Sequence, residues 1–276
     1  VRVWAVADGG ERAFFAGHQG RVTGLAFSPV GDLASVGVDG RLVIWDISTG
    51  YQAEEVKTQS GVGLRSVAFS NDGRHLAAAT ANAEVVLWTG RQRVESVLLG
   101  HEGQVESVSF SANNDWLASG GRDGQTWVWN LRRGGLGRAL GEGGGWVQSV
   151  SFSADGKLLA AGGVDGKIRV WDRVGFQLEY ELDAGSGIED LSFGEGGAGV
   201  QLFVGTWQDA LLLTLAEGVG VKDEMVAPIL FPAYPNPFND AMQIPYRLVE
   251  DGRVTLRVYD VLGQEVRRID LGSQAA

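Results

Sequence analysis

Cysteine is absent from this 276-residue chain, and histidine occurs only three times. The lack of cysteine excludes disulfides, thiolate metal sites and cysteine nucleophiles. So few histidines argue against a metal site, and nothing in the sequence points to another cofactor. No apolar run reaches the roughly 18 residues of a membrane-spanning helix, so no transmembrane segment is expected.

Basic residues are in the minority, with 23 Lys and Arg against 34 Asp and Glu and a net charge of −11. Contact with a phosphate backbone needs clustered Lys and Arg, so a nucleic-acid partner is not expected. No charged-then-apolar leader follows Val1, which leaves open whether a signal peptide precedes it.

Glycine, by contrast, is abundant, with 42 residues spread along the chain. Glycine supplies positive φ at tight turns, so this abundance indicates many turns. Short strands joined by such turns are typical of an all-β protein.

Aromatic residues recur with a period of about 42 residues, as in repeat architectures. Two series run in phase: Phe27, Phe69, Phe110, Phe152 and Phe193, and Trp4, Trp45, Trp88, Trp129 and Trp171. Within one repeat, apolar and polar residues alternate in segments that predict strands at 105–110, 116–120, 125–129 and 136–140. Four short antiparallel strands per repeat form one β-propeller blade.

Dipeptides at fixed places in the repeat resemble those of WD repeats. Gly-His pairs stand at 17–18 and 100–101, and Trp-Asp pairs at 45–46 and 171–172. The resemblance implies an all-β chain with a WD-repeat β-propeller over residues 1–216. Residues 1–16 are expected to be the last strands of one blade, followed by four complete blades and a fifth that begins at Ile188, with more blades in the parent ring. In the last blade either Leu213 or Leu215 replaces the tryptophan.

Two sets of polar residues occupy the positions of the hydrogen-bonded tetrad of WD repeats. They are His18, Ser35, Asp39 and Trp45, and His101, Ser119, Asp123 and Trp129. Histidine, serine and aspartate together also suggest a hydrolase. Because the set occurs twice at nearly the same offsets, we interpret it as structural and expect no catalytic residue. The second and fourth repeats depart from the set, with Ala78 and Ala161 in place of serine.

The resemblance also implies a binding face, near the hairpin aspartate and the start of the innermost strand of each blade. The corresponding positions in this chain are Arg65, Glu106, Arg122, Trp146, Gln148 and Glu189. Arginine and tryptophan are favoured anchors in interfaces. The plainer interpretation is that each side chain is only solvated or packed on a neighbouring blade.

After residue 216 the period stops, and residues 217–231 read as a linker before a small β domain at 232–276. This domain resembles the C-terminal sorting domain of type IX secretion substrates, which is immunoglobulin-like and incomplete here. The resemblance rests on the motif Tyr234, Pro235, Asn236, Pro237, Phe238 and Asn239, and on alternating strands at 243–248, 253–259 and 264–271. Asp251-Gly252 predicts a hairpin between the first two strands.

These features predict a non-enzymatic scaffold that binds a protein or peptide on a propeller face. If the tail addresses the secretion machinery, the protein is extracellular or displayed on the outer surface of a bacterium. The alternative is a propeller enzyme or lectin that binds a small ligand at the central channel. A sensor linked to further domains is a third possibility.

Overall fold

The computed structural model describes residues 1–56, 61–90, 94–141, 144–194, 200–208, 210–215, 229–230, 246–247, 252–259 and 265–274. The chain divides into two compact units, Val1–Leu215 and Ala216–Ala276. The described residues form β-strands and connecting turns, with a short 3-10 helix, η1, at Leu131–Arg133.

The first unit contains four four-stranded antiparallel sheets, each built from strands that are consecutive in the chain. The first is β3 (Val22–Phe27), β4 (Leu33–Gly37), β5 (Leu42–Asp46) and β6 (Tyr51–Val56). The second is β7 (Leu64–Phe69), β8 (His75–Thr80), β9 (Glu84–Thr89) and β10 (Val94–Leu99). The third is β11 (Val105–Phe110), β12 (Trp116–Gly121), β13 (Thr126–Asn130) and β14 (Leu136–Ala139). The fourth is β15 (Val147–Phe152), β16 (Leu158–Gly163), β17 (Lys167–Asp172) and β18 (Leu178–Asp183).

Two smaller sheets complete this unit. Strands β1 (Arg2–Trp4) and β2 (Glu11–Phe14) pair before the first blade. Strands β19 (Ile188–Gly194), β20 (Val200–Thr206) and β21 (Ala210–Leu215) form a three-stranded fifth blade. These sheets confirm the predicted blade architecture.

The apolar cores lie between neighbouring sheets. One core joins Ala34, Val36 and Ile44 of the first blade to Leu76 and Trp88 of the second, and equivalent cores join each later pair of blades. The middle strands of the four-stranded blades are therefore covered on both faces, as in β4, where all five residues are buried. In the fifth blade, Phe203 of the middle strand β20 is 47 % exposed. A single blade cannot cover its own apolar faces, so the blades stabilise one another by stacking.

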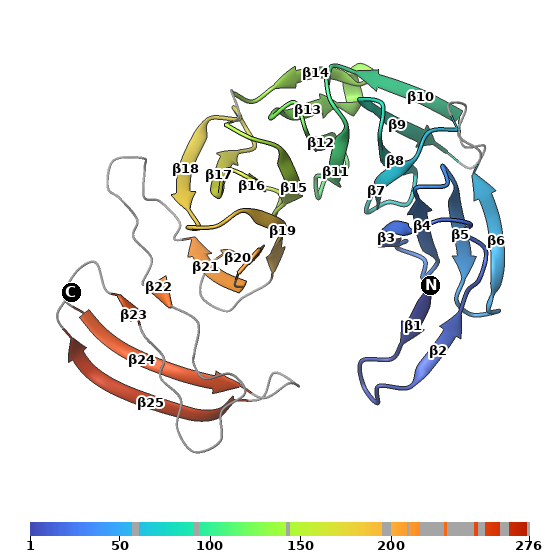
Figure 1. The fold of residues 1–276 in the computed structure, drawn as a ribbon. Helices are drawn as coiled ribbons and strands as arrows, with labels where there is room; N and C mark the ends of the chain where they lie inside the picture. Colours follow the sequence, from blue (N-terminus) through green and yellow to red (C-terminus); the bar gives the residue numbers. More distant parts are fainter. Residues whose placement is uncertain are drawn as a thin grey trace. The chain divides into compact units, whose positions relative to one another are not determined.

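The innermost strands β3, β7, β11, β15 and β19 lie side by side in that order (Figure 1). Serine hydroxyls link them: Ser107 Oγ accepts from Val150 N at 3.2 Å, and Ser149 Oγ accepts from Leu191 N at 3.2 Å. These serines recur in phase with the aromatic residues, so they too could have indicated the repeat from the sequence.

Strand pairing decides which leucine replaces tryptophan in the fifth blade. In the third and fourth blades the tryptophan stands opposite Leu117 and Leu159. The equivalent Leu202 stands opposite Leu213. Leu213 therefore takes the tryptophan position, although Leu215, at 3 % exposure, is the more deeply buried of the two.

In the second unit, β22 (Ile229–Leu230) pairs with β23 (Tyr246–Arg247), and β24 (Gly252–Tyr259) pairs with β25 (Glu265–Gln274). The predicted hairpin across Asp251-Gly252 is therefore wrong, because β23 pairs with an earlier segment and Gly252 belongs to β24 itself. The third expected strand is present as β25. The motif at 234–239 lies outside the described residues.

Candidate functional site

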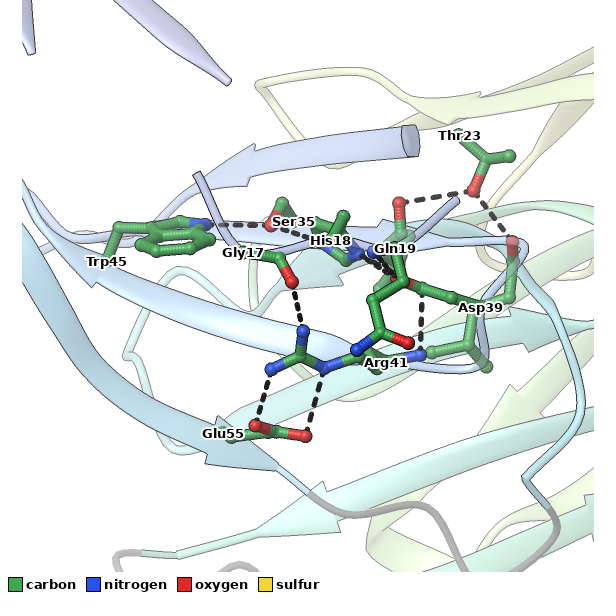
Figure 2. A network of polar contacts seen from close by, with 11 residues as sticks. Gly17, His18, Gln19, Thr23, Ser35, Asp39, Arg41, Trp45 and Glu55 are labelled. Carbon is green, nitrogen blue, oxygen red and sulfur yellow. Dashed lines mark hydrogen bonds and ion pairs between the residues drawn. The ribbon is translucent and has the colours of Figure 1, made fainter. Parts of the chain in front are cut away.

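The four residues of the first tetrad form one continuous chain of hydrogen bonds (Figure 2). Trp45 Nε1 donates to Ser35 Oγ at 2.8 Å, and Ser35 Oγ lies 2.8 Å from His18 Nε2. His18 Nδ1 lies 3.1 Å from both oxygens of Asp39. A carboxylate only accepts, so Nδ1 carries the ring proton, and the serine hydroxyl donates to Nε2.

The second tetrad has the same arrangement. Trp129 Nε1 donates to Ser119 Oγ at 2.9 Å, and Ser119 Oγ lies 2.8 Å from His101 Nε2. His101 Nδ1 lies 2.8 Å from Asp123 Oδ2. Both serines are fully buried and already accept from an indole N–H. A substrate would have to displace that contact, so the geometry favours a structural network over a nucleophile.

Electrostatics agree with a neutral imidazole held by an ionised carboxylate. Burial lowers the pKa of His101, and the nearby Asp123 opposes this shift only in part. For Asp39, burial alone would raise the pKa. The hydrogen bonds from His18 and from the backbone N–H groups of Gln19 and Arg41 outweigh burial and hold the pKa of Asp39 below its ordinary value.

We expect acid to destabilise the fold through His101. Below the ordinary histidine pKa of about 6.5, the unfolded chain binds a proton that the folded chain does not. The free energy of unfolding therefore decreases as the pH is lowered, by up to about 1.4 kcal/mol per pH unit. His101→Gln should flatten this dependence between pH 7 and pH 5 in chemical denaturation. His75→Gln, at a site outside the tetrads, should keep the wild-type slope; an unchanged slope in His101→Gln would contradict the expectation.

The predicted binding residues share a feature of the innermost strands. In every blade the pairing between the innermost strand and the next strand skips one residue, which forms a β-bulge. The skipped residues are Thr23, Arg65, Glu106, Gln148 and Glu189. A bulge frees its residue from the ladder and re-aims the side chain. Thr23 was not predicted; its Oγ1 donates to the Leu64 carbonyl at 2.7 Å and so ties the first blade to the second.

Several of these side chains are connected across three blades. Arg65 Nη2 donates to Gln104 Oε1 at 3.1 Å, and Gln104 Nε2 donates to Glu106 Oε1 at 2.7 Å. Arg122 Nε also donates to Glu106 and has its guanidinium 4.3 Å from the centre of the Trp146 ring. Sequence reasoning missed Gln104, although it directly precedes β11 as Trp146 precedes β15.

We call the set formed by Thr23, Arg65, Gln104, Glu106, Arg122, Trp146, Gln148 and Glu189 the bulge face. Trp146 is 43 % exposed, although its ring lies under a guanidinium. Gln148 is partly buried and Glu189 exposed, and neither has a hydrogen bond to the other described residues of this set. The bulge face therefore offers an exposed aromatic anchor beside ordered polar groups.

The described residues contain no group of three or more His, Asp or Glu side chains placed to hold a metal ion. Within the same ranges, no helix has the length and apolar character needed to cross a membrane.

Comparison with known proteins finds two families. The WD domain, G-beta repeat family matches residues 9–46, 54–89, 92–130 and 138–172. The first match runs from β2 through β5, so each repeat joins the outer strand of one sheet to the three inner strands of the next. The secretion system C-terminal sorting domain family matches residues 232–276.

Curated relatives match about half of the chain. Small ribosomal subunit protein RACK1y of Oryza sativa subsp. japonica is 34% identical over 140 residues, covering 48% of this chain and 41% of that protein. Guanine nucleotide-binding protein subunit beta of Nicotiana tabacum is 30% identical over 141 residues, covering 47% and 37%. Periodic tryptophan protein 2 homolog of Mus musculus is 26% identical over 154 residues, covering 48% and 17%. The matches span less than half the length of these relatives.

Proposed function

Since this chain belongs to the WD-repeat family, we propose that its first unit is a non-enzymatic scaffold that binds a protein or peptide on the bulge face. The proposal is supported chiefly by the contact of Arg122 with the exposed ring of Trp146, next to polar groups contributed by the second and third blades. Tryptophan and arginine are the residues most enriched among the energetic centres of interfaces. Their mutual contact reduces the side-chain entropy lost on binding.

The charged groups of the bulge face restrict which partners would complement this surface. Glu106 is neutralised by Arg122, whereas the side chain of Arg65 donates to the neutral amide of Gln104 and Glu189 stays exposed. A partner with one hydrophobic or aromatic side chain and polar groups of both signs would complement this surface. A strongly basic or strongly acidic segment would meet like charge at Arg65 or at Glu189.

Peptide selection against the immobilised chain tests the proposal. Peptides recovered from a random displayed library should bind with affinities that fall about tenfold or more in Trp146→Ala and Arg122→Ala, measured by fluorescence anisotropy. Arg132→Ala is the matched control, because Arg132 pairs with Asp115 at the opposite ends of the same strands. Equal binding by all four proteins would contradict the assignment of the bulge face.

The sorting domain at 232–276 supports a second part of the proposal: the protein leaves the cell through a type IX secretion system and acts outside it or on the surface of the bacterium. In a host with this system, and with the host's own export leader added, the full chain should reach the medium or the outer surface. The same chain ending at residue 231 should stay in the periplasm. Fractionation followed by immunoblotting distinguishes the two, and equal export of both would contradict this part.

A further inference from the structure

A pocket of about 230 Å³ lies where the third and fourth blades meet, and we call it the interblade pocket. Trp116 and Asn130, which line it, pair where β12 begins and β13 ends, whereas the bulge of β11 pairs with Gly121 at the other end of β12. The interblade pocket is therefore separate from the bulge face. Its lining also includes Val128, Arg133, Leu136, Arg138, Val174 and Phe176.

One wall of the interblade pocket is a tryptophan that departs from the repeat. In each four-stranded blade a leucine stands opposite the blade tryptophan, and the residue before that leucine holds an equivalent place. This residue is Trp116 in the third blade, but Asp32, His75 and Leu158 in the others. The third blade thus places an indole at a position where the other three blades have none.

The opposite wall is a phenylalanine that departs from the repeat as well. Phe176 lies in the loop between β17 and β18 and has a φ of 52°, which is unfavourable for a bulky side chain. The first and third blades have glycine four residues after the strand-ending Asp46 and Asn130, where Phe176 follows Asp172 by the same number. Backbone strain of this kind is concentrated at functional sites.

The two departures meet across the junction between the blades. The ring centres of Trp116 and Phe176 lie 5.0 Å apart, with an angle of 72° between the ring planes. Phe176 is only 7 % exposed, and Val128, which also lines the pocket, is fully buried. The interblade pocket therefore has aromatic and apolar walls that the repeat by itself would not supply.

Two arginines add positive charge to these walls. The Arg138 guanidinium lies 5.5 Å from the centre of the Phe176 ring, and its Nη2 donates to the Gly175 carbonyl at 2.7 Å. Arg133 is exposed, and neither arginine forms an ion pair with the described residues. The Asp172 carboxylate accepts instead from backbone N–H groups, that of Gly175 at 2.9 Å among them. A guanidinium has five N–H donors, so Arg138 can donate to a further acceptor.

These groups restrict the chemistry of a ligand. An apolar cavity of about 150 Å³ can hold benzene, so a pocket of about 230 Å³ has room for one ring and a short substituent. Guanidinium groups pair with carboxylates through two parallel hydrogen bonds, and two of them would repel a cation. The chain as a whole carries a net charge of −11, so attraction of an anion has to come from such local arginines.

We propose that the interblade pocket binds an aromatic carboxylate, in which one ring is joined to a carboxylate by a short chain. The ring packs between Trp116 and Phe176, and the carboxylate accepts from Arg138, with Arg133 adding to the positive potential. A free aromatic acid and the last residue of a peptide ending in phenylalanine both have this chemistry. The proposal does not rest on the function proposed for the bulge face.

3-Phenylpropionate, titrated into the full chain, is the first probe. The indole N–H resonance of Trp116, assigned by its loss in Trp116→Phe, should shift saturably. Arg138→Gln should weaken binding about tenfold and Arg133→Gln about threefold. Arg132→Gln is the matched control: it removes the same charge from the neighbouring residue, which pairs with Asp115 and does not line the pocket, so affinity should stay within about twofold of wild type. The dispersion of the other indole resonances reports whether each variant is folded.

Two neutral or shortened compounds test the chemistry. 3-Phenylpropanamide keeps the ring but has no charge, and should bind about tenfold more weakly than the acid. Propionate keeps the charge but has no ring, and should also bind at least about tenfold more weakly.

A short peptide ending in phenylalanine distinguishes the two sources of the ligand. If it binds as tightly as 3-phenylpropionate, and its amidated form does not, the site is assigned to peptide carboxyl termini; a response to the free acid alone assigns it to small molecules. The proposal is overturned if 3-phenylpropionate leaves the Trp116 resonance unmoved, if the amide binds as tightly as the acid, or if Arg138→Gln and Arg132→Gln bind equally well.

Discussion

Asp123→Ala is expected to lower the free energy of unfolding by about 2–3 kcal/mol, because it removes the acceptor of three hydrogen bonds, two of which come from the buried His101 and the partly buried Gln125. The carboxylate accepts from His101 Nδ1 at 2.8 Å, from the Glu102 N–H at 3.0 Å and from the Gln125 N–H at 3.1 Å. Removing it leaves these donors facing alanine. It also frees the imidazole that holds Ser119 in place.

Urea denaturation measures this effect. Glu102→Ala is the matched control, since it removes an exposed carboxylate from the residue that follows His101. It should change the free energy of unfolding by no more than about 0.5 kcal/mol. If Asp123→Ala unfolds at the same urea concentration as Glu102→Ala, the tetrad contributes nothing to stability.

Leu117→Ala is expected to destabilise the chain by about 2–5 kcal/mol, the range for deleting a fully buried leucine side chain. Leu117 is 0 % exposed and belongs to the core between the second and third blades. The cavity left by the substitution would lie between two sheets. Neither sheet can close the cavity without shifting against its other neighbour, which favours the upper part of the range.

Leu136→Ala provides the control for this second substitution. Leu136 lies on the outer strand β14 of the same blade and is 65 % exposed, so its truncation should change stability by about 0.5 kcal/mol or less. Thermal unfolding followed by circular dichroism would show the difference. Similar unfolding of the two variants would mean that the contacts between blades do not carry the stability of the first unit.

The tetrads were accessible from the sequence because each depends on local order. His18, Ser35, Asp39 and Trp45 keep nearly the same spacing as the set from His101 to Trp129, and strands of fixed length place residues at those spacings side by side. The bulge residues were named only as places near the start of a strand. Whether these residues leave the hydrogen-bond ladder depends on how the innermost strand pairs with the next strand. Residue types alone do not specify that pairing.

The tail shows the opposite case. Alternation predicted strands within residues 243–271, but the choice of partner for Tyr246–Arg247 depended on Ile229–Leu230, a segment without a strand signal of its own. Asp-Gly is a strong local turn signal, yet local preference was overridden here because Gly252 pairs with Gln274.

The sequence by itself determined the repeating blades, the strand order within them and the burial of Trp45, Trp88, Trp129 and Trp171, because a period of about 42 residues repeats one local structure whose apolar faces must be covered. Trp4, the first of the same series, is 54 % exposed. Only the tertiary structure decided which side chains meet between blades, as in the chain of contacts from Arg65 to Trp146. Those contacts depend on residues about one repeat apart meeting across a packed junction. Such meetings follow from how the sheets stack, and no single repeat encodes them.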